Sequence, residues 1–270
     1  MSRLVIFGPG YTGARIAAAV ERLDWRVVRI GREQLDRAQP EIAAATHILS
    51  TVPPGEEGDP VLARYHDAIR RSGAWLGYLS STGVYGDTGG AWVDESASVG
   101  LGRRSARAAA DLAWLDLGAR AFRLPGIYGP GRSPLERIAE GAAYRIDRPG
   151  QVFSRVHIDD IVAAVLAGFA GPPGAYNIAD DLPAPQHEVT AYAARLLGAP
   201  LPPLRAPDEL PPSARAFYLE NRRIANRKAK RLLDWRPTYR TYREGLRALS
   251  ATISPASVSS PPSTAANDQR

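Results

Sequence analysis

The sequence of 270 residues contains no cysteine, which excludes disulfide bonds and thiolate metal sites. It also lacks any apolar run near the roughly 18 residues of a membrane-spanning helix, so no membrane partner is expected. The apolar run at residues 4–7 is too short for a secretion signal, and the expected location is the cytoplasm. Lysine is scarce as well: Lys228 and Lys230 are the only two.

The formal net charge is +6, and arginines spread along the chain carry almost all of it. The densest basic stretch covers residues 221–231, where apolar residues recur at roughly helical spacing. This pattern favours a solvated helix face over a nucleic-acid surface, so no nucleic-acid partner is expected. The charge is compatible with a small-molecule substrate that is anionic.

Apolar residues make up 44% of the chain, enough for a sizeable core. In the first half, short apolar runs alternate with segments of helical periodicity. They predict strands over 4–7, 26–30, 47–52, 75–81 and 119–124, and helices over 10–23, 60–71 and 105–117. This alternation predicts an α/β protein with a doubly wound parallel sheet, the Rossmann arrangement.

The second half is less regular. It predicts helices over 158–169, 186–197 and 222–233, a return to the sheet over 175–178 and an irregular loop over 201–212. We expect one Rossmann domain over 1–253, with a smaller lobe built mainly from 131–148 and 183–249. Residues 254–270 are rich in Ser, Pro, Ala and Thr and predict a disordered tail.

A glycine-rich turn follows the first predicted strand. Gly8, Gly10 and Gly13 fit the pattern G-x-G-x-x-G, with Tyr11 and Thr12 between them. The turn follows a strand and opens a helix, which is the context that the dinucleotide-binding motif requires. Gly8 would allow the tight turn, Gly10 the approach of a pyrophosphate, and Gly13 close packing of helix and strand. The amides at the helix start would then bind the pyrophosphate.

The end of the second strand indicates which dinucleotide is bound. NAD sites place an acidic residue there to bind the ribose hydroxyls. Here Arg32 comes first and Glu33 follows it. A guanidinium suits the 2′-phosphate of NADP, so NADP is the predicted cofactor. NAD is the alternative, with Arg32 as a surface residue and Glu33 on the ribose.

Four later segments carry a family resemblance. They are 79–87 (LSSTGVYGD), 123–132 (RLPGIYGPGR), 155–161 (RVHIDDI) and 176–181 (YNIADD). With the glycine turn, they resemble the NAD-dependent epimerase/dehydratase family, a branch of the extended short-chain dehydrogenases/reductases. The resemblance covers roughly residues 3–249 and implies the Rossmann fold.

The resemblance also implies site residues. Ser81 would polarise a substrate carbonyl or hydroxyl, or else bond its neighbours' backbone at the strand end. The nicotinamide would contact the backbone of Pro125, Gly126 and Ile127. The cofactor groove would be lined by Thr51, Val52, Pro53 and Ser80.

The catalytic signature of the family is missing. Its members carry Tyr-x-x-x-Lys, in which the tyrosine is the general acid/base and the lysine holds the nicotinamide ribose. Arg103 and Arg107 stand at these two positions when the spacing is counted from Asp111. Arg107 could hold a ribose, whereas Arg103 could bind an anion but could not act as a base. With arginines in place of the Tyr-Lys pair, the chain resembles an atypical subgroup of the family.

Tyr85 and Tyr128 follow strand ends, where ligands bind in this fold, and either could supply the missing proton. Packing at the sheet edge is the alternative for both. Gly126 replaces the asparagine common in nucleotide-sugar epimerases, which disfavours such a substrate. His157 is expected to be structural, and Asp159 and Asp160 to cap the following helix. No spacing indicates a metal site.

These residues predict an NADP-linked oxidoreductase acting on a small carbonyl or hydroxyl compound, with Arg103 or Arg132 holding an anionic group. A nucleotide-sugar epimerase or dehydratase is one alternative, and a non-catalytic NADPH sensor is another. A homodimer is also open, because family members often pair through two sheet-flanking helices.

Overall fold

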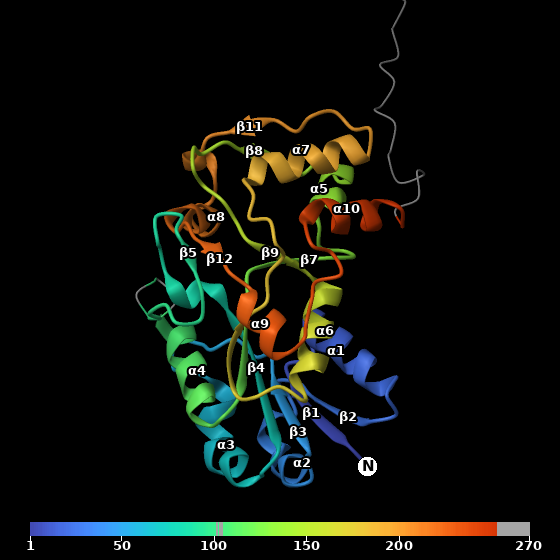
Figure 1. The fold of residues 1–270 in the computed structure, drawn as a ribbon, viewed down its shortest axis with the longest axis vertical. Coiled ribbons are helices and arrows are strands. Elements are labelled where there is room, and N and C mark those ends of the chain that lie inside the picture. The colour runs from blue at the N-terminus through green and yellow to red at the C-terminus, as the bar shows by residue number, and fades with distance from the viewer. Residues whose placement is uncertain (101, 103–104, 253–270) are drawn as a thin grey trace, which may run out of the picture.

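Six parallel strands form the central sheet of the computed structural model, in the order β10-β6-β4-β3-β1-β2 (Figure 1). The structure describes residues 1–100, 102 and 105–252. The strands are β1 (Arg3–Phe7), β2 (Arg26–Ile30), β3 (His47–Ser50), β4 (Trp75–Ser81), β6 (Arg120–Leu124) and β10 (Gly174–Asn177). Every strand predicted for this sheet is present, and the doubly wound α/β class is confirmed.

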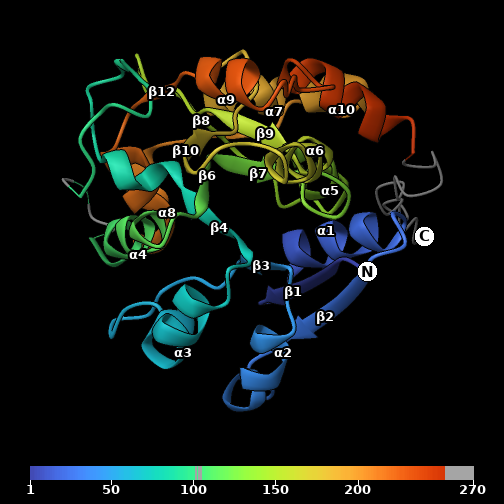
Figure 2. The same cartoon turned by 60° about the horizontal axis from the view of Figure 1, so that its bottom comes forward.

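Helices cover both faces of this sheet (Figure 2). On one face α1 (Tyr11–Glu21) packs against α6 (Ile158–Gly168), and their apolar sides share a core with Leu4 and Ile6 of β1. The other face carries α2 (Gln39–Ala43), α3 (Pro60–Arg71) and α4 (Ser105–Asp116), whose core includes Val5 and Phe7. Because β1 is buried on both faces, its apolar residues run without interruption.

The strand order reverses direction at β1. The chain passes from β1 to β2 on one side, and then crosses back to β3 on the other side of β1. The connections that follow β1 and β3 therefore lead away from each other at the carboxyl ends of these two strands. In open α/β sheets ligands bind at this kind of crevice. The fold therefore places the glycine turn after β1 next to the segment after β3.

Smaller elements form a lobe beyond the carboxyl ends of the strands (Figure 1). Helices α5 (Pro134–Ala139), α7 (Gln186–Leu196) and α10 (Tyr242–Ser250) pack around a separate apolar cluster that contains Tyr128 and Leu135. Three two-stranded pairs accompany them: β7 (Gly126–Tyr128) with β9 (Arg155–His157), β8 (Arg145–Ile146) with β11 (Leu204–Arg205), and β5 (Trp92–Val93) with β12 (Arg223–Ile224). Short helix α8 (Pro212–Arg215) and a 3-10 turn at Ala216–Leu219 complete the wall that faces the sheet.

The predicted helix over 222–233 is wrong in its first half. Residues Arg223–Ile224 form strand β12, and only Arg227–Leu232 are helical, as α9. The amides of Arg223 and Ala225 donate to the carbonyls of Ala91 and Val93, at 2.9 Å each. Pairing with the distant β5 overrides the local helical spacing. The loop predicted over 201–212 likewise contains a paired strand, β11.

The expected cap of α6 is also corrected. His157 is the N-cap residue, and its Nδ1 accepts from the amide of Asp159 at 3.2 Å. Asp160 is buried instead and accepts from the amides of Thr238 and Tyr239. It therefore ties α6 to the segment after α9, and burial raises the pKa of Asp160 to about 6.

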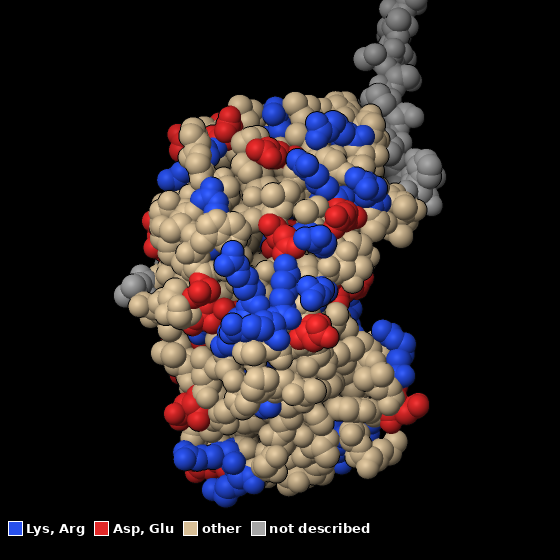
Figure 3. All heavy atoms as spheres, viewed as in Figure 1, with Lys and Arg blue, Asp and Glu red and all other residues tan. Residues whose placement is uncertain are grey.

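Basic side chains gather over α9, with carboxylates beside them (Figure 3). Asp181 pairs with Lys230 and lies 3.3 Å from Arg240. Ala229, on the inner side of α9, is fully buried against the sheet core. The helical part of the basic stretch, α9, thus has a buried inner side and partly neutralised outer charges. Within residues 1–100, 102 and 105–252, no helix combines the length and apolar character that crossing a membrane would demand.

Candidate functional site

A cleft of about 1840 Å³ opens between the carboxyl ends of the strands and the lobe. Nearly all the predicted cofactor residues line it: Gly8, Gly10, Tyr11, Thr12, Arg32, Thr51, Val52, Pro53, Ser80, Arg107, Pro125, Gly126 and Ile127. Gly13 lies behind this lining. The cleft exceeds the roughly 300–1,000 Å³ of pockets for drug-sized ligands, so it has room for a dinucleotide and a second molecule.

The three glycines of the turn meet three different demands. Gly8 has a φ of +77°, which an L side chain rarely adopts. A Cβ on Gly13 would lie 2.7 Å from the Gly8 carbonyl oxygen, so Gly13 is required for packing. A Cβ on Gly10 would meet nothing within 4 Å. The fold itself therefore does not need a glycine at position 10, whereas a ligand close to the backbone would.

Hydrogen bonds tie the glycine turn and the start of α1 to two other loops of the cleft. The Thr51 hydroxyl, just after β3, donates to the Gly8 carbonyl. The Tyr11 hydroxyl donates to the Pro130 carbonyl at 3.1 Å, and the Arg15 guanidinium lies over the Tyr11 ring. Burial raises the pKa of Tyr11, so its hydroxyl stays protonated and keeps this bond. These contacts hold the glycine turn against the segments after β3 and β7.

The two residues weighed for the ribose lie differently. Arg32 lines the cleft directly after β2 and Gly31, whereas Glu33 is outside the lining. Both side chains are exposed. The position that would meet the adenosine ribose therefore presents a cation.

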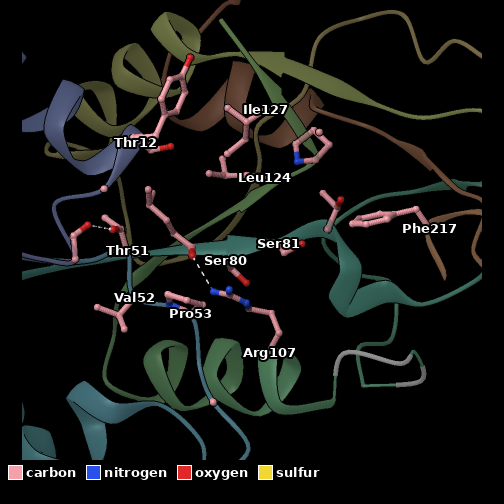
Figure 4. A pocket seen from close by; sticks show the side chains of 18 of the residues that line it. Thr12, Thr51, Val52, Pro53, Ser80, Ser81, Arg107, Leu124, Ile127 and Phe217 are labelled. Carbon is pink, nitrogen blue, oxygen red and sulfur yellow. Dashed lines mark hydrogen bonds between the residues drawn. The ribbon is translucent and has the colours of Figure 1, made fainter. Parts of the chain in front are cut away.

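Two serines at the end of β4 face the cleft (Figure 4). Ser81 Oγ accepts from the Gly83 amide at 3.1 Å, so its expected bond to neighbouring backbone is present while it also lines the cleft. Ser80 is buried, and its Oγ has no hydrogen-bond partner among the described residues. Thr12 and Thr51 lie toward one end of the view, and Ser81 and Phe217 toward the other.

Arg107 reaches into the cleft from α4 (Figure 4). Its Nη1 donates to the Tyr78 hydroxyl at 2.9 Å and to the Leu79 carbonyl at 3.4 Å. These bonds hold a positive charge in the wall of the cleft, beside Ser80. Arg103 lies outside the described residues.

The two tyrosines considered as proton donors lie outside the lining of this cleft. Tyr85 is 2% exposed; its hydroxyl accepts from Arg123 Nη1 at 2.9 Å and donates to Asn177 Oδ1 at 2.8 Å. Burial raises the pKa of Tyr85 to about 12. Arg123 in turn pairs with buried Asp111 through Nη2 at 2.7 Å and Nε at 3.2 Å. Tyr85 is therefore part of a buried polar network below the site.

Tyr128 lines a second, smaller cavity of about 460 Å³ in the lobe. Its hydroxyl is buried without a hydrogen-bond partner among the described residues. Burial, and then the charge of Asp180, raise the pKa of Tyr128. The two cavities share lining residues, namely Gly126, Ile127, Arg132, Arg137, Tyr144, Arg155 and Gln186.

Three residues without a predicted role also line the cleft, on the lobe side: Arg155, Phe217 and Arg222. Arg155 stood in a recognised motif but carried no signal of its own. Arg222 pairs with Glu220 at 2.9 Å. Phe217 is 50% exposed and presents part of its ring to the cleft. Among the described residues no group of His, Asp or Glu side chains is arranged to hold a metal ion.

The chain resembles several solved structures. A conserved protein of unknown function from Silicibacter pomeroyi is 40% identical, with a TM-score of 0.86 over 93% of this chain and 99% of that one. The human epimerase family protein SDR39U1, solved with NADPH, is 14% identical, with a TM-score of 0.73 over 93% and 100% of the two chains. The UDP-glucose 4-epimerase of Thermotoga maritima, solved with UDP-glucose, is also 14% identical, with a TM-score of 0.77 over 92% and 97%. The expected resemblance to epimerases and dehydratases is confirmed in the fold.

A curated relative adds a named reaction. A 3-diazoavenalumate denitrifying reductase from a Streptomyces species is 33% identical over 143 residues, or 48% of this chain. The match spans 47% of that protein, about half its length. No model of a protein family matches the chain.

Proposed function

Because this chain belongs to one family with the conserved Silicibacter pomeroyi protein and has the fold of the NAD-dependent epimerases and dehydratases, we propose that it is an NADP-dependent oxidoreductase. Its substrate is a small carbonyl or hydroxyl compound. Support for the class also comes from the relatives, of which one is named a reductase and another was solved with NADPH.

One observation carries the proposal. The glycine turn, Arg32 and the segments after β3, β4 and β6 line a single cleft, although they are far apart in the sequence. Gly10 offers open backbone where a pyrophosphate would approach, and Arg32 offers a guanidinium where a 2′-phosphate would lie. This donor set fits NADP. NAD lacks the phosphate that Arg32 would bind.

The chain's own residues would bind and orient the reactants. When bound, the nicotinamide supplies the hydride that carbonyl reduction requires. Arg107, held by Tyr78 and Leu79, would bind the nicotinamide ribose. The backbone from Pro125 to Ile127 would form the wall against the nicotinamide. Ser81 would donate its hydroxyl to the substrate oxygen and polarise the carbonyl.

Two features favour net reduction over sugar epimerisation. The only lysines of the sequence, Lys228 and Lys230, lie on α9. This helix packs its inner side against the sheet core and lies outside the lining of the cleft. The family's Tyr-Lys pair is therefore missing from the site. Gly126 also offers no side chain to a nucleotide sugar. A carbonyl reductase needs one proton on one oxygen. Ser81 is the donor that we place beside that oxygen, and solvent water would restore the proton that the Ser81 hydroxyl gives up.

NADPH oxidation with a panel of aldehydes and ketones tests the proposal. We expect turnover with at least one compound, reduced at least tenfold in Ser81→Ala, consistent with loss of a donor to the developing oxyanion. Tight NADPH binding with no turnover across the panel would favour the sensor. Bound cofactor that survives purification and shows no net oxidation would favour the epimerase.

A further inference from the structure

Arg155 lies where the cofactor cleft and the lobe cavity meet, since it lines both. It belongs to β9 and pairs in register with Gly126 of β7. A Cβ on Gly126 would lie 3.8 Å from Arg155 Cγ. The stem of this arginine is therefore directly beside the segment that we propose as the nicotinamide wall.

The charge of Arg155 has no carboxylate partner within 4.0 Å among the described residues. By contrast, Arg123 pairs with Asp111, and Arg222 pairs with Glu220. Burial lowers the pKa of Arg155, with Asp180 the largest opposing charge. A partly buried, uncompensated guanidinium is costly, and a bound anion would remove the cost.

The hydrogen bonds of Arg155 also leave a defined edge open. Nη1 donates to the carbonyls of Phe153 at 2.7 Å and Ala184 at 2.9 Å, which fixes the guanidinium in place. Nε and Nη2 make no hydrogen bond within the part of the chain that the structure describes. These two nitrogens form the side of the guanidinium that matches the two oxygens of a carboxylate.

We propose that Arg155 binds the carboxylate of the substrate, which is a small organic acid whose carbonyl group is reduced beside Ser81. This inference rests on the proposed function and names its substrate class. Arg132 and Arg137, both exposed and in both cavity walls, would attract the acid to the cleft.

The surrounding side chains favour an apolar body between the two polar ends. Tyr144, Phe217 and Tyr218 line the same cleft. Tyr218 packs edge-on against Phe153, whose carbonyl holds Arg155. Aromatic walls with a few convergent polar groups are typical of pockets for small organic ligands. An aromatic or other apolar acid thus fits the lining better than a sugar.

Calorimetric titration with matched probes tests the inference. The probes are 4-formylbenzoate, its uncharged methyl ester and phenyl phosphate, each titrated with and without saturating NADP⁺. We expect the wild type to bind 4-formylbenzoate about 10- to 100-fold more tightly than the ester, the range of one charge-assisted bidentate contact. Tighter binding of phenyl phosphate than of the benzoate would overturn the choice of carboxylate.

Three variants assign the effect to one residue. Arg155→Met should abolish the preference for the acid, and Arg155→Lys should keep only part of it because the fork is lost. Arg145→Met is the matched control: Arg145 is partly buried, donates to the Pro202 carbonyl at 2.8 Å and lies outside both cavity linings. It should bind as the wild type does. The NADP⁺ affinity of each variant reports whether its fold is intact.

The outcomes separate this inference from the proposed function. Equal affinity for acid and ester in the wild type, no binding of either at millimolar concentration, or an unchanged preference in both Arg155 variants would overturn the carboxylate site. Such results alongside normal NADP⁺ binding would leave the oxidoreductase proposal standing. Absence of NADP⁺ binding alongside an Arg155-dependent preference for the acid would support the carboxylate site and overturn the proposed NADP-dependent function.

Discussion

Replacing Tyr85 by Phe should destabilise the protein without removing a catalytic group. The hydroxyl is 2% exposed and joins Arg123 to Asn177 through bonds of 2.9 and 2.8 Å. Its removal leaves a guanidinium donor and an amide oxygen buried without this partner. A hydrogen bond to a charged group contributes about 1.5–3 kcal/mol and a neutral one about 0.5–1.5 kcal/mol. The expected loss in the free energy of unfolding is therefore about 2–4 kcal/mol.

For a chain of this size, such a loss lowers the melting temperature by roughly 5–15 °C. Urea unfolding followed by circular dichroism measures the free energy, and NADPH oxidation measures turnover at a temperature where the variant is folded. Turnover per folded molecule should be unchanged, because the Tyr85 hydroxyl is outside the cleft lining.

Tyr128→Phe is the matched comparison. The Tyr128 hydroxyl has no hydrogen-bond partner among the described residues, so its removal should cost less than about 1 kcal/mol. Tyr85→Phe with wild-type stability would refute the network. Tyr85→Phe with wild-type stability and no turnover would make its hydroxyl the proton source. Loss of turnover confined to Tyr128→Phe would assign the proton to Tyr128.

Four further variants address the cofactor and the pH dependence of stability. Arg32→Ala should weaken NADPH binding about 10- to 100-fold and leave NADH binding unchanged, by calorimetry, because only NADPH carries the 2′-phosphate. Gly10→Val should keep wild-type stability in urea but lose at least about tenfold in NADPH affinity. Gly13→Ala should be destabilised, because its Cβ would lie 2.7 Å from the Gly8 carbonyl oxygen. Burial raises the pKa of Asp180 to about 8 from 3.8, so the folded state holds a proton that the unfolded chain releases. The free energy of unfolding should therefore fall between about pH 4 and pH 8, and Asp180→Asn should flatten that slope.

Each of these has a contradicting outcome. Equal loss of NADPH and NADH affinity in Arg32→Ala would show that this residue does not distinguish the two. Unchanged NADPH affinity in Gly10→Val would mean that no ligand approaches that backbone. For the pH series, exposed Asp208→Asn is the control, and a wild-type slope in Asp180→Asn would assign the slope to other groups.

Local features of the sequence were enough to predict the sheet and the cofactor end of the cleft. Short apolar runs, several of them ended by glycine or proline, predicted the strands of the central sheet, because strands such as β1 that are buried on both faces need continuous apolar residues. The glycine turn predicted its own geometry, since the demands on Gly8 and Gly13 are local or involve adjacent elements. The carboxyl ends of parallel strands then meet at one edge, which brings Thr51, Ser81 and Pro125 to the same cleft.

Features that depend on distant pairing could not be predicted in this way. Residues 223–224 have helical spacing but form a strand with β5, which lies about 130 residues earlier. The environment of Tyr85 depends on Arg123 and Asn177, from two other strands. The exposed edge of Arg155 depends on carbonyls of Phe153 and Ala184, which no pattern of spacing reveals.

Calorimetric titration of the wild-type protein with NADPH and NADH tests most directly whether the cleft is a dinucleotide site. We expect a single binding event for NADPH, with NADH at least about tenfold weaker, since only Arg32 and the 2′-phosphate distinguish the two. Tighter binding of NADH would contradict the role of Arg32. No heat with either nucleotide at millimolar concentration would contradict the assignment of the cleft itself.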